Sequence, residues 1–455
     1  MPTFAAADLA AWSDGRWTGA SAAVTGFGTD TRALRPGDAF VAIRTDRRDG
    51  HDFLPAARAQ GAACALVSRP VADALPQLVV ADAPAALRAV AAAWRRRFPG
   101  PVIGVTGSVG KTSTKDLLGA LLGPDAFVTE ANLNNLLGVP LMLLRLEPDR
   151  HRWAVIEAGM SVPGELGVSA AVLRPDVAIV TAVAPVHLEG VGSLAGVARE
   201  KAALVAALAD GGRAFLPASL LAWPDFAARA ERCVAVRFAG EPAPAVRPAR
   251  LVEASLGEEA GRRVLRLDGE DFPLGPVSDG LARNAALAVL AARAVGADLP
   301  ALRAALAAWT PPAGRGSVHA DGPRTFYVDC YNSSPASLLD AARCFDRLGA
   351  ATGAPRLWVL GGMAELGADS AALHRAAGAA LPVRADDHVV AFGGDAAHLL
   401  AGLPAGTGPR VAAATLDEVR AVVAAHGGFV FVKGSRSFAL ERALPAALTA
   451  RLSFH

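Results

Sequence analysis

A Gly-rich turn followed by a Lys-Thr pair is the part of this sequence with the most specific chemistry. Residues 106–113 form this segment, which we call the phosphate loop. Glycines let successive backbone N–H groups approach phosphate oxygens, while Lys111 is placed to contact the β- and γ-phosphates and Thr112 to ligate Mg²⁺. The residues predicted to bind a nucleoside triphosphate are Thr106, Gly107, Ser108, Val109, Gly110, Lys111, Thr112 and Ser113.

The phosphate loop departs from the common spelling of this motif. G-x-x-x-x-G-K-[ST] requires a glycine five residues before Gly110, where this chain has Val105. A chance glycine turn beside a surface lysine is therefore the alternative interpretation. The β-branched run at 102–105 and the amphipathic segment at 116–122 predict the order strand, loop and helix that phosphate binding requires. This order favours the functional interpretation.

Three further side chains have positions that suit catalysis or metal binding. Glu157 follows a strand predicted at 154–156, and His187 follows one predicted at 178–183. The carboxyl ends of parallel strands face the ligand crevice, so Glu157 is placed to hold a metal ion; a solvated strand-end carboxylate is the alternative. A lone histidine is more often structural than catalytic, but the position of His187 after a strand leaves the two interpretations about equal. Lys201 lies in a predicted helix, where a lysine considered alone is a surface residue.

Three amides lie within four positions of the segment 129–140, namely Asn132, Asn134 and Asn135. Amide groups both donate and accept hydrogen bonds, so they suit contacts with polar ligands. They equally suit turns, and the sequence alone leaves both interpretations open.

Two segments in the last third of the chain also follow predicted strands. The first, 329–335, reads Asp-Cys-Tyr-Asn-Ser-Ser-Pro and opens a helix with proline near its first position. Its Asp329 suits a ribose hydroxyl or a nucleotide-linked group. In the second segment, Lys433 and Arg436 offer cations to a phosphate or a carboxylate.

The elements that must position these residues divide the chain into three blocks, 1–98, 99–311 and 312–455. Strands alternate with helices in each block, which predicts α/β domains with largely parallel sheets. We expect a small N-terminal α/β domain, a central phosphate-loop ATPase domain with a parallel sheet, and a C-terminal Rossmann-like domain. Residues 238–276 show alternating patches that indicate a small β excursion within the central domain.

Composition excludes several classes of protein. The chain has 455 residues, 52% of them hydrophobic, and 45 basic residues against 43 acidic ones, which argues against an electrostatically driven nucleic-acid binder. Its four cysteines form no C-x-x-C pair, so neither a zinc site nor a disulfide framework is indicated. No signal peptide and no membrane span is predicted. We expect a cytoplasmic protein that acts as a monomer on small molecules.

Taken in this order, the motifs resemble the Mur ligase family over nearly the whole chain. Residues 30–32, 35–42 and 49–53 are similar to its UDP-sugar-binding signature, and 106–112 to its ATP loop. The segment 329–335 resembles the member of the family that adds a D-alanyl-D-alanine dipeptide. Residues 361–367 with His374, and 433–436, are similar to the same member.

The resemblance implies an ATP-dependent ligase that joins D-alanyl-D-alanine to UDP-N-acetylmuramoyl-tripeptide through an acyl phosphate, in peptidoglycan precursor synthesis. It implies catalytic roles for Lys111, Glu157, His187 and Lys201. It also implies that Thr112, Glu157, His187 and Lys201 bind Mg²⁺, with two ions expected, and that Lys201 is carbamylated. Further nucleotide contacts are implied for Asn284, Arg315 and Asp329. The implied substrate contacts are Thr31, Arg32, Asp49, Gly50, His51, Asn132, Asn134, Asn135, Tyr331, Asn332, Lys433 and Arg436.

Some positions depart from the family pattern, and other functions compete with this one. Gly280 stands where the family usually has histidine, and Ser334 replaces an asparagine of the segment that follows Asp329. The first alternative is another Mur-type or a folylpolyglutamate-type amino-acid ligase. The second is a motor or switch ATPase, which would need an aspartate where Glu157 ends its strand. A non-catalytic relative that kept the fold is the third.

Overall fold

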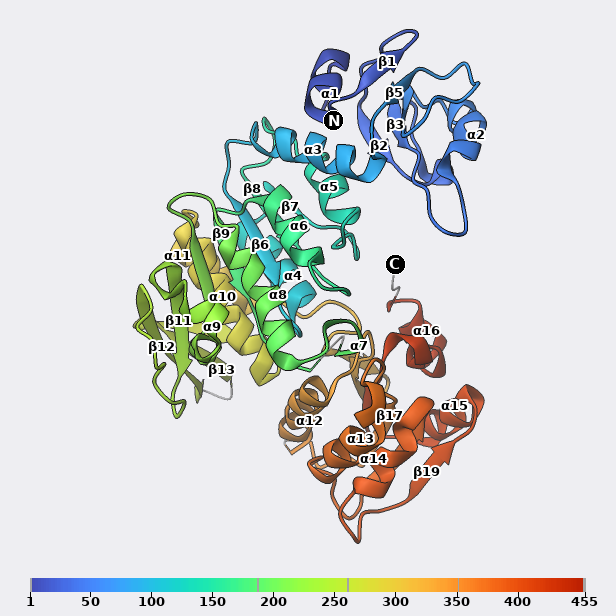
Figure 1. Cartoon of the computed structure of the whole chain (residues 1–455). Helices are drawn as coiled ribbons and strands as arrows, with labels where there is room; N and C mark the ends of the chain where they lie inside the picture. Colours follow the sequence, from blue (N-terminus) through green and yellow to red (C-terminus); the bar gives the residue numbers. More distant parts are fainter. Residues whose placement is uncertain (1, 186–187, 260–261, 351, 453–455) are drawn as a thin grey trace.

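The chain forms three α/β domains that follow one another in chain order, each built around its own sheet (Figure 1). The computed structural model describes residues 2–185, 188–259, 262–350 and 352–452. The three-domain α/β architecture predicted from the sequence is confirmed. In the described part of the chain, no helix is both long and apolar enough to cross a membrane.

The N-terminal domain is a small sheet in the order β1-β5-β4-β3-β2, in which only the β1–β5 pair is antiparallel. Its elements are α1 (Ala6–Ser13), β1 (Arg16–Thr18), β2 (Gly26–Gly28), β3 (Asp38–Val41), α2 (Leu54–Ala59), β4 (Cys64–Val67), β5 (Gln77–Val79) and α3 (Ala83–Arg95). Strands β3 and β4 are buried along their whole lengths. Strands β1 and β2 were not predicted, because each has three residues and none of them is buried.

The first half of the central domain places three strand ends side by side. Strand β6 lies between β8 and β9, and all three run parallel. The elements here are β6 (Val102–Thr106), α4 (Lys111–Leu122), β7 (Ala126–Val128), α5 (Gly138–Leu143), β8 (Trp153–Glu157), α6 (Glu165–Leu173), β9 (Val177–Val180), α7 (Leu188–Val191) and α8 (Leu194–Ala206). Strands β6, β8 and β9 are wholly buried, as expected for a sheet covered on both faces.

The second half of the central domain extends the same sheet and ends in two helices. Its elements are β10 (Arg213–Pro217), α9 (Pro224–Ala227), β11 (Cys233–Phe238), β12 (Arg250–Glu259), β13 (Arg262–Leu267), β14 (Glu270–Leu274), α10 (Asp279–Ala294) and α11 (Leu299–Ala308). Strands β12, β13 and β14 are antiparallel neighbours at the sheet edge, so the predicted β excursion is confirmed. Helix α10 packs against α4 and begins after Ser278, whose Oγ accepts the backbone N–H of Leu281.

The C-terminal domain is a second doubly wound sheet in the order β15-β16-β20-β17-β18-β19. Its elements are β15 (Ser317–Asp321), β16 (Arg324–Asp329), α12 (Pro335–Ala350), β17 (Arg356–Gly361), α13 (Ser370–Ala379), β18 (His388–Phe392), α14 (Ala397–Gly402), β19 (Arg410–Ala413), α15 (Leu416–Ala425), β20 (Phe429–Lys433) and α16 (Ala446–Thr449). The four predicted strands are the central ones. The edge strands β15 and β19 were missed, because exposed residues interrupt their apolar pattern.

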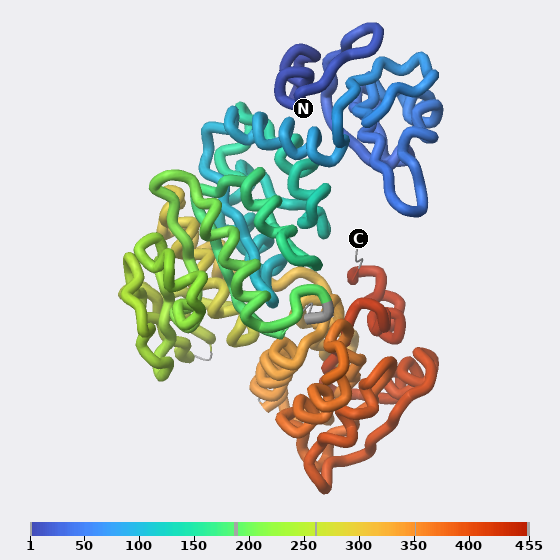
Figure 2. Tube along the Cα trace, in the orientation of Figure 1, coloured from blue at the N-terminus to red at the C-terminus, as the bar shows by residue number. Residues whose placement is uncertain are grey.

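The two domain boundaries differ in the chemistry of their contacts. One continuous apolar core includes Phe4 and Trp94 from the N-terminal domain together with Met142 and Leu166 from the central domain. Figures 1 and 2 show α3 lying along the central domain beside α5. The C-terminal domain has separate cores of its own. The first two domains are thus fused through apolar side chains, whereas the third is not.

Candidate active site

The phosphate loop joins β6 to α4, as the motif predicted, and its glycines are required by close neighbours. Gly107 and Gly110 have φ angles of +147° and +86°, respectively. A Cβ atom on Gly107 would lie 1.9 Å from Thr181 Oγ1, and one on Gly110 would lie 2.2 Å from Asn284 Nδ2. The loop is therefore enclosed by the end of β9 on one side and by α10 on the other.

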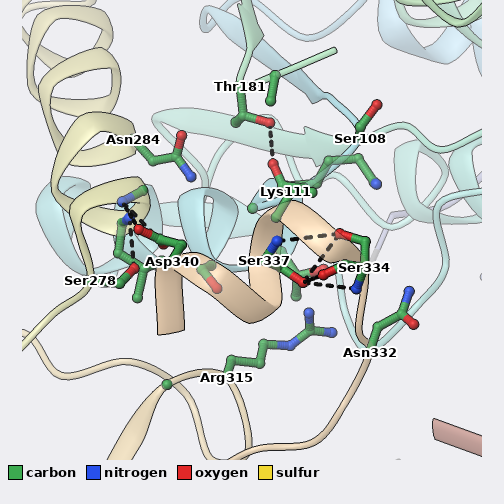
Figure 3. Close-up of a pocket in the computed structure, with 18 of the residues that line it drawn as sticks. Ser108, Lys111, Thr181, Ser278, Asn284, Arg315, Asn332, Ser334, Ser337 and Asp340 are labelled. Carbon is green, nitrogen blue, oxygen red and sulfur yellow. Dashed lines mark hydrogen bonds between the residues drawn. The ribbon is translucent and has the colours of Figure 1, made fainter. Parts of the chain in front are cut away.

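Thr181 and Ser108 tie the phosphate loop to the segment after β9. The Thr181 hydroxyl donates to the Val109 carbonyl at 2.6 Å (Figure 3). The backbone N–H of Ser108 donates to the Ala182 carbonyl at 2.8 Å, and Ser108 Oγ accepts the N–H of Ala184 at 2.9 Å. Sequence reasoning did not single out Thr181. The sequence feature that could have identified it is a hydroxyl side chain directly after a buried strand.

Lys111 is half-buried at the start of α4, and its Nζ donates to the Gly107 carbonyl at 2.7 Å. Burial lowers the pKa of this lysine, and the positive charge of Arg315 lowers it further, whereas Glu157 opposes both effects. A cation held in the curl of the loop is what a triphosphate site requires. The position of Lys111 agrees with the predicted role.

Glu157 ends β8 with its side chain buried, and only one of its two carboxylate oxygens has a partner. Asn134 Nδ2 donates to Glu157 Oε1 at 2.7 Å, while Oε2 is buried and has no hydrogen-bond partner among the described residues. An unpartnered buried carboxylate oxygen is energetically unfavourable unless a cation or donor approaches it. Glu157 therefore fits the predicted role of metal ligand.

Lys201 is not a surface residue, because only 1% of its surface is exposed. It lies in α8, and burial lowers the pKa of its amine to about 7, helped by the positive charge of Lys111. The predicted metal ligand His187 lies outside the residues that the structure describes. Among the described residues, no three His, Cys, Asp or Glu side chains gather into a metal centre.

Residues of the C-terminal domain face the phosphate loop across a cavity of about 380 Å³. Arg315 follows the central domain, and its guanidinium lies 3.7 Å from the centre of the Tyr331 ring. Both line the cavity, together with Asn132, Glu157, Asn284, Asp329, Asn332 and Lys433. The structure thus brings together most of the predicted nucleotide-binding and catalytic residues from two domains.

Lys433 has a different local role from the free cation that the sequence suggested. Its buried Nζ donates to Asp329 Oδ2 at 2.7 Å and to the Asn332 carbonyl at 3.1 Å. It therefore fixes the loop after β16, and its contact with a substrate stays a prediction. Arg436 forms an ion pair with Glu441 Oε1 at 2.5 Å.

Two other predicted polar residues stabilise turns. Asn135 Oδ1 accepts the backbone N–H groups of Leu137 and Gly138 at the start of α5. His374 is fully buried, and its Nε2 accepts the N–H of Met363 at 2.9 Å. This contact holds the loop after β17, which contributes to the cavity lining.

The predicted sugar-nucleotide residues lie in the N-terminal domain. Asp49 Oδ1 accepts the N–H of His51 and contacts His51 Nδ1 at 2.5 Å, so the buried imidazole stabilises this turn. A Cβ on Gly50 would lie 2.5 Å from the backbone nitrogen of Ile43. Thr31 and Arg32 lie in an exposed turn in which Asp30 binds the Arg32 guanidinium. Substrate contact by these residues stays a prediction.

Three family models match successive parts of the chain. Residues 23–95 match the model described as Mur ligase family, catalytic domain; residues 105–292 match the Mur ligase middle domain; residues 314–436 match the Mur ligase, glutamate ligase domain. Together the matches cover more than half of the chain. The chain belongs to the Mur ligase family.

Individual members of the family are similar to this Mur ligase over nearly its whole length. The UDP-N-acetylmuramoyl-tripeptide--D-alanyl-D-alanine ligase of Escherichia coli (strain K12) is 34% identical over 440 residues, which cover 95% of this chain and 96% of that protein. The crystal structure of MurF from Acinetobacter baumannii superposes with a TM-score of 0.85 at 28% identity, covering 99% of each chain. MurF from Thermotoga maritima in complex with ADP shares the fold, with a TM-score of 0.78 at 24% identity over 94% of this chain and 97% of that chain.

Proposed function

We propose that this Mur ligase joins D-alanyl-D-alanine to UDP-N-acetylmuramoyl-tripeptide at the expense of ATP, in peptidoglycan synthesis. One observation carries the proposal: the phosphate loop of the central domain and the loop after Asp329 of the C-terminal domain line a single cavity. An activated acid and an incoming amine can meet only if their binding domains share a site. The Escherichia coli relative named above carries this activity in its name.

The reaction runs in two transfers. A terminal carboxylate oxygen of the tripeptide bonds to the γ-phosphorus of ATP as the bond to ADP breaks, which gives an acyl phosphate. The amine of D-alanyl-D-alanine then forms the amide bond, loses a proton and displaces phosphate. Carboxylate and triphosphate repel each other, and the cations of Lys111 and Arg315 reduce that repulsion where the two anions meet.

Thr112, Glu157, His187 and Lys201 are proposed to hold Mg²⁺, which neutralises phosphate charge when bound. The unpartnered oxygen of Glu157 supports this assignment. We propose that the Lys201 amine adds to CO₂ and releases a proton, which gives an anionic carbamate. Its pKa of about 7 supports this step, because the neutral amine is the form that adds.

We assign substrates to domains with proposed boundaries 1–98, 99–311 and 312–455, supported by the division into three sheets. The N-terminal domain binds the nucleotide sugar through Thr31, Arg32, Asp49, Gly50 and His51, the central domain binds ATP, and the C-terminal domain binds the dipeptide. The protein is proposed to be a cytoplasmic monomer that supplies precursors for cell-wall growth, cell shape and cell division.

Phosphate release measures this function directly. ATP hydrolysis by the purified protein should require both UDP-N-acetylmuramoyl-tripeptide and D-alanyl-D-alanine, with ligated product seen by mass spectrometry. The Lys111→Ala protein should lose at least about a hundredfold in turnover, because charge neutralisation at the phosphates is removed. Release of phosphate without either peptide would identify a plain ATPase. Preference for a free amino acid over the dipeptide would identify another ligase of the family.

A further inference from the structure

The contact between the central and C-terminal domains contains a carboxylate at the start of helix α10. Asp340, on α12 of the C-terminal domain, accepts the backbone N–H of Gly280 at 3.0 Å through Oδ1 and at 3.1 Å through Oδ2 (Figure 3). Ser278 already caps α10 from within the central domain. The Gly280 N–H is a separate donor of the first turn, and its bond to Asp340 connects the two domains.

Gly280 makes this approach possible because it has no side chain. A Cβ atom at this position would lie 2.5 Å from Asp340 Oδ2, which is closer than real Cβ contacts. The first turn of a helix carries partial positive charge, so a carboxylate there is also electrostatically favoured. The glycine that departs from the family pattern thus has a specific neighbour in this chain.

A second, reciprocal contact lies two turns further along α12. Arg347 Nη2 donates to the Val277 carbonyl at 2.9 Å, and Arg347 Nη1 lies 3.3 Å from Asp279 Oδ1. Arg263 also pairs with Asp279. Helix α12 therefore contacts the central domain through the Asp340 carboxylate, which accepts a backbone N–H, and through the Arg347 guanidinium, which donates to a carbonyl and pairs with Asp279. We call the contacts of Asp340 and Arg347 the α10–α12 joint.

The joint connects the two helices that carry the active-site loops. On α10, Gly280 and Asn284 are four residues apart and so lie on the same face, and Asn284 covers the phosphate loop at Gly110. Helix α12 begins directly after the loop that follows Asp329, the last residue of β16. A shift of α12 against α10 would therefore move Asp329 and its loop relative to the phosphate loop.

We propose that Asp340 is a positioning residue, which holds the C-terminal domain at the start of α10 so that the loop after Asp329 faces the phosphate loop. The kinetic part of this inference rests on the proposed ligase function. Asp340 lines the same cavity, but both of its carboxylate oxygens accept the Gly280 N–H, so we assign it to holding the domains rather than to the chemistry. The linker at 309–316 supplies the covalent connection, and the joint supplies a second attachment that fixes the orientation.

Three variants test the pair. Asp340→Ala removes the acceptor and should lower kcat about tenfold, the scale of a lost charge-assisted hydrogen bond, with KM for ATP within twofold of the parent. Asp340→Asn keeps one acceptor oxygen and should recover part of that loss. Gly280→Ala places a methyl group against the carboxylate and should match Asp340→Ala. In the double variant Gly280→Ala, Asp340→Ala, the effects should not add, because both act through one contact.

Asp417→Asn is the matched control, since Asp417 is an exposed acid of the same domain that pairs with Arg420, three residues away, and kcat should not change. Small-angle scattering with ADP supplies a readout free of catalysis: the Asp340→Ala protein should show a larger radius of gyration than the parent. An unchanged kcat, additive effects, or an increase in KM for ATP alone would overturn the proposal. If the parent protein fails to ligate, the ligase function fails, and scattering still decides the role of the joint.

Discussion

Single atoms at the phosphate loop determine how tightly a nucleotide is enclosed. Gly110 has φ +86°, and a Cβ there would meet Asn284 Nδ2 at 2.2 Å. Gly110→Ala should therefore raise KM for ATP at least about tenfold, since backbone strain and a clash both displace the loop. Gly123 is the matched control, because its φ is +79° but nothing lies within 4 Å of its Cβ position. Gly123→Ala should lower the melting temperature and leave KM unchanged; equal KM values in both variants would contradict the assignment.

The buried amine of Lys201 gives a pH-dependent stability with a definite sign. Its pKa falls from 10.5 to about 7 in the folded protein because of burial, so between these values the unfolded chain binds more protons. The free energy of unfolding therefore rises with pH through that window. The slope is about 1.4 kcal/mol per pH unit where the amine is neutral in the folded protein and protonated in the unfolded chain. Below pH 7 the amine is protonated in both states, so the full cost of burying its charge remains.

Lys201→Met removes this titration. In buffer free of CO₂, the variant should melt at a higher temperature than the parent at pH 7, and this advantage should shrink towards pH 9.5. Differential scanning fluorimetry of both proteins across the range measures the difference, in which other titrations cancel. A constant difference in melting temperature would show that the folded protein does not depress this pKa.

Residues of the site were predictable where one local motif placed them. The phosphate loop and Glu157 follow buried strands, and their roles depend on chain order alone. Thr181 and Asp340 were missed, because each acts on a residue more than fifty positions away. Asn135 and His374 have side chains of a ligand-binding type, yet their bonds go to neighbouring backbone, and only the folded structure distinguishes the two uses.

At the scale of elements, the order of strands in the central sheet assembles the site. Strand β6 pairs with β8 and β9, so the phosphate loop, Glu157 and Thr181 all lie at one edge. Alternating strands and helices predicted this sheet from the sequence, because buried parallel strands have continuous apolar runs. The edge strands were not predicted, because they are short or partly exposed and so have no continuous apolar run.

The Thr181 hydroxyl makes one of the bonds that connect the segment after β9 to the phosphate loop. Thr181→Val preserves shape but leaves the Val109 carbonyl without the 2.6 Å bond from Oγ1. We expect the unfolding free energy to fall by about 1–3 kcal/mol and KM for ATP to rise several-fold, as the loop loosens. Thr407→Val is the control, because its hydroxyl bond is exposed and lies in the C-terminal domain. Steady-state kinetics with thermal melts measure both effects; identical behaviour of the two variants would contradict this role.

At the scale of the whole molecule, the two domain boundaries should respond differently to salt. The first boundary is an apolar core in which Trp94 packs and also donates from Nε1 to the Leu146 carbonyl. The second contains the charged α10–α12 joint. Salt screens exposed charges but does not weaken apolar burial. Raised ionic strength should therefore loosen the C-terminal domain and leave the other two fused.

Limited trypsin digestion tests this difference, because each boundary carries arginines. Cleavage after Arg315, in the linker, should accelerate severalfold between low and high salt, and should yield fragments near 1–315 and 316–455. Cleavage after Arg95 or Arg97 should stay slow, since Arg95 pairs with Asp176 and Arg97 with Asp8 beside the apolar core. The Asp340→Ala protein should be cut at the linker quickly even at low salt. Preferential cutting near position 95 would instead place the weaker connection between the first two domains.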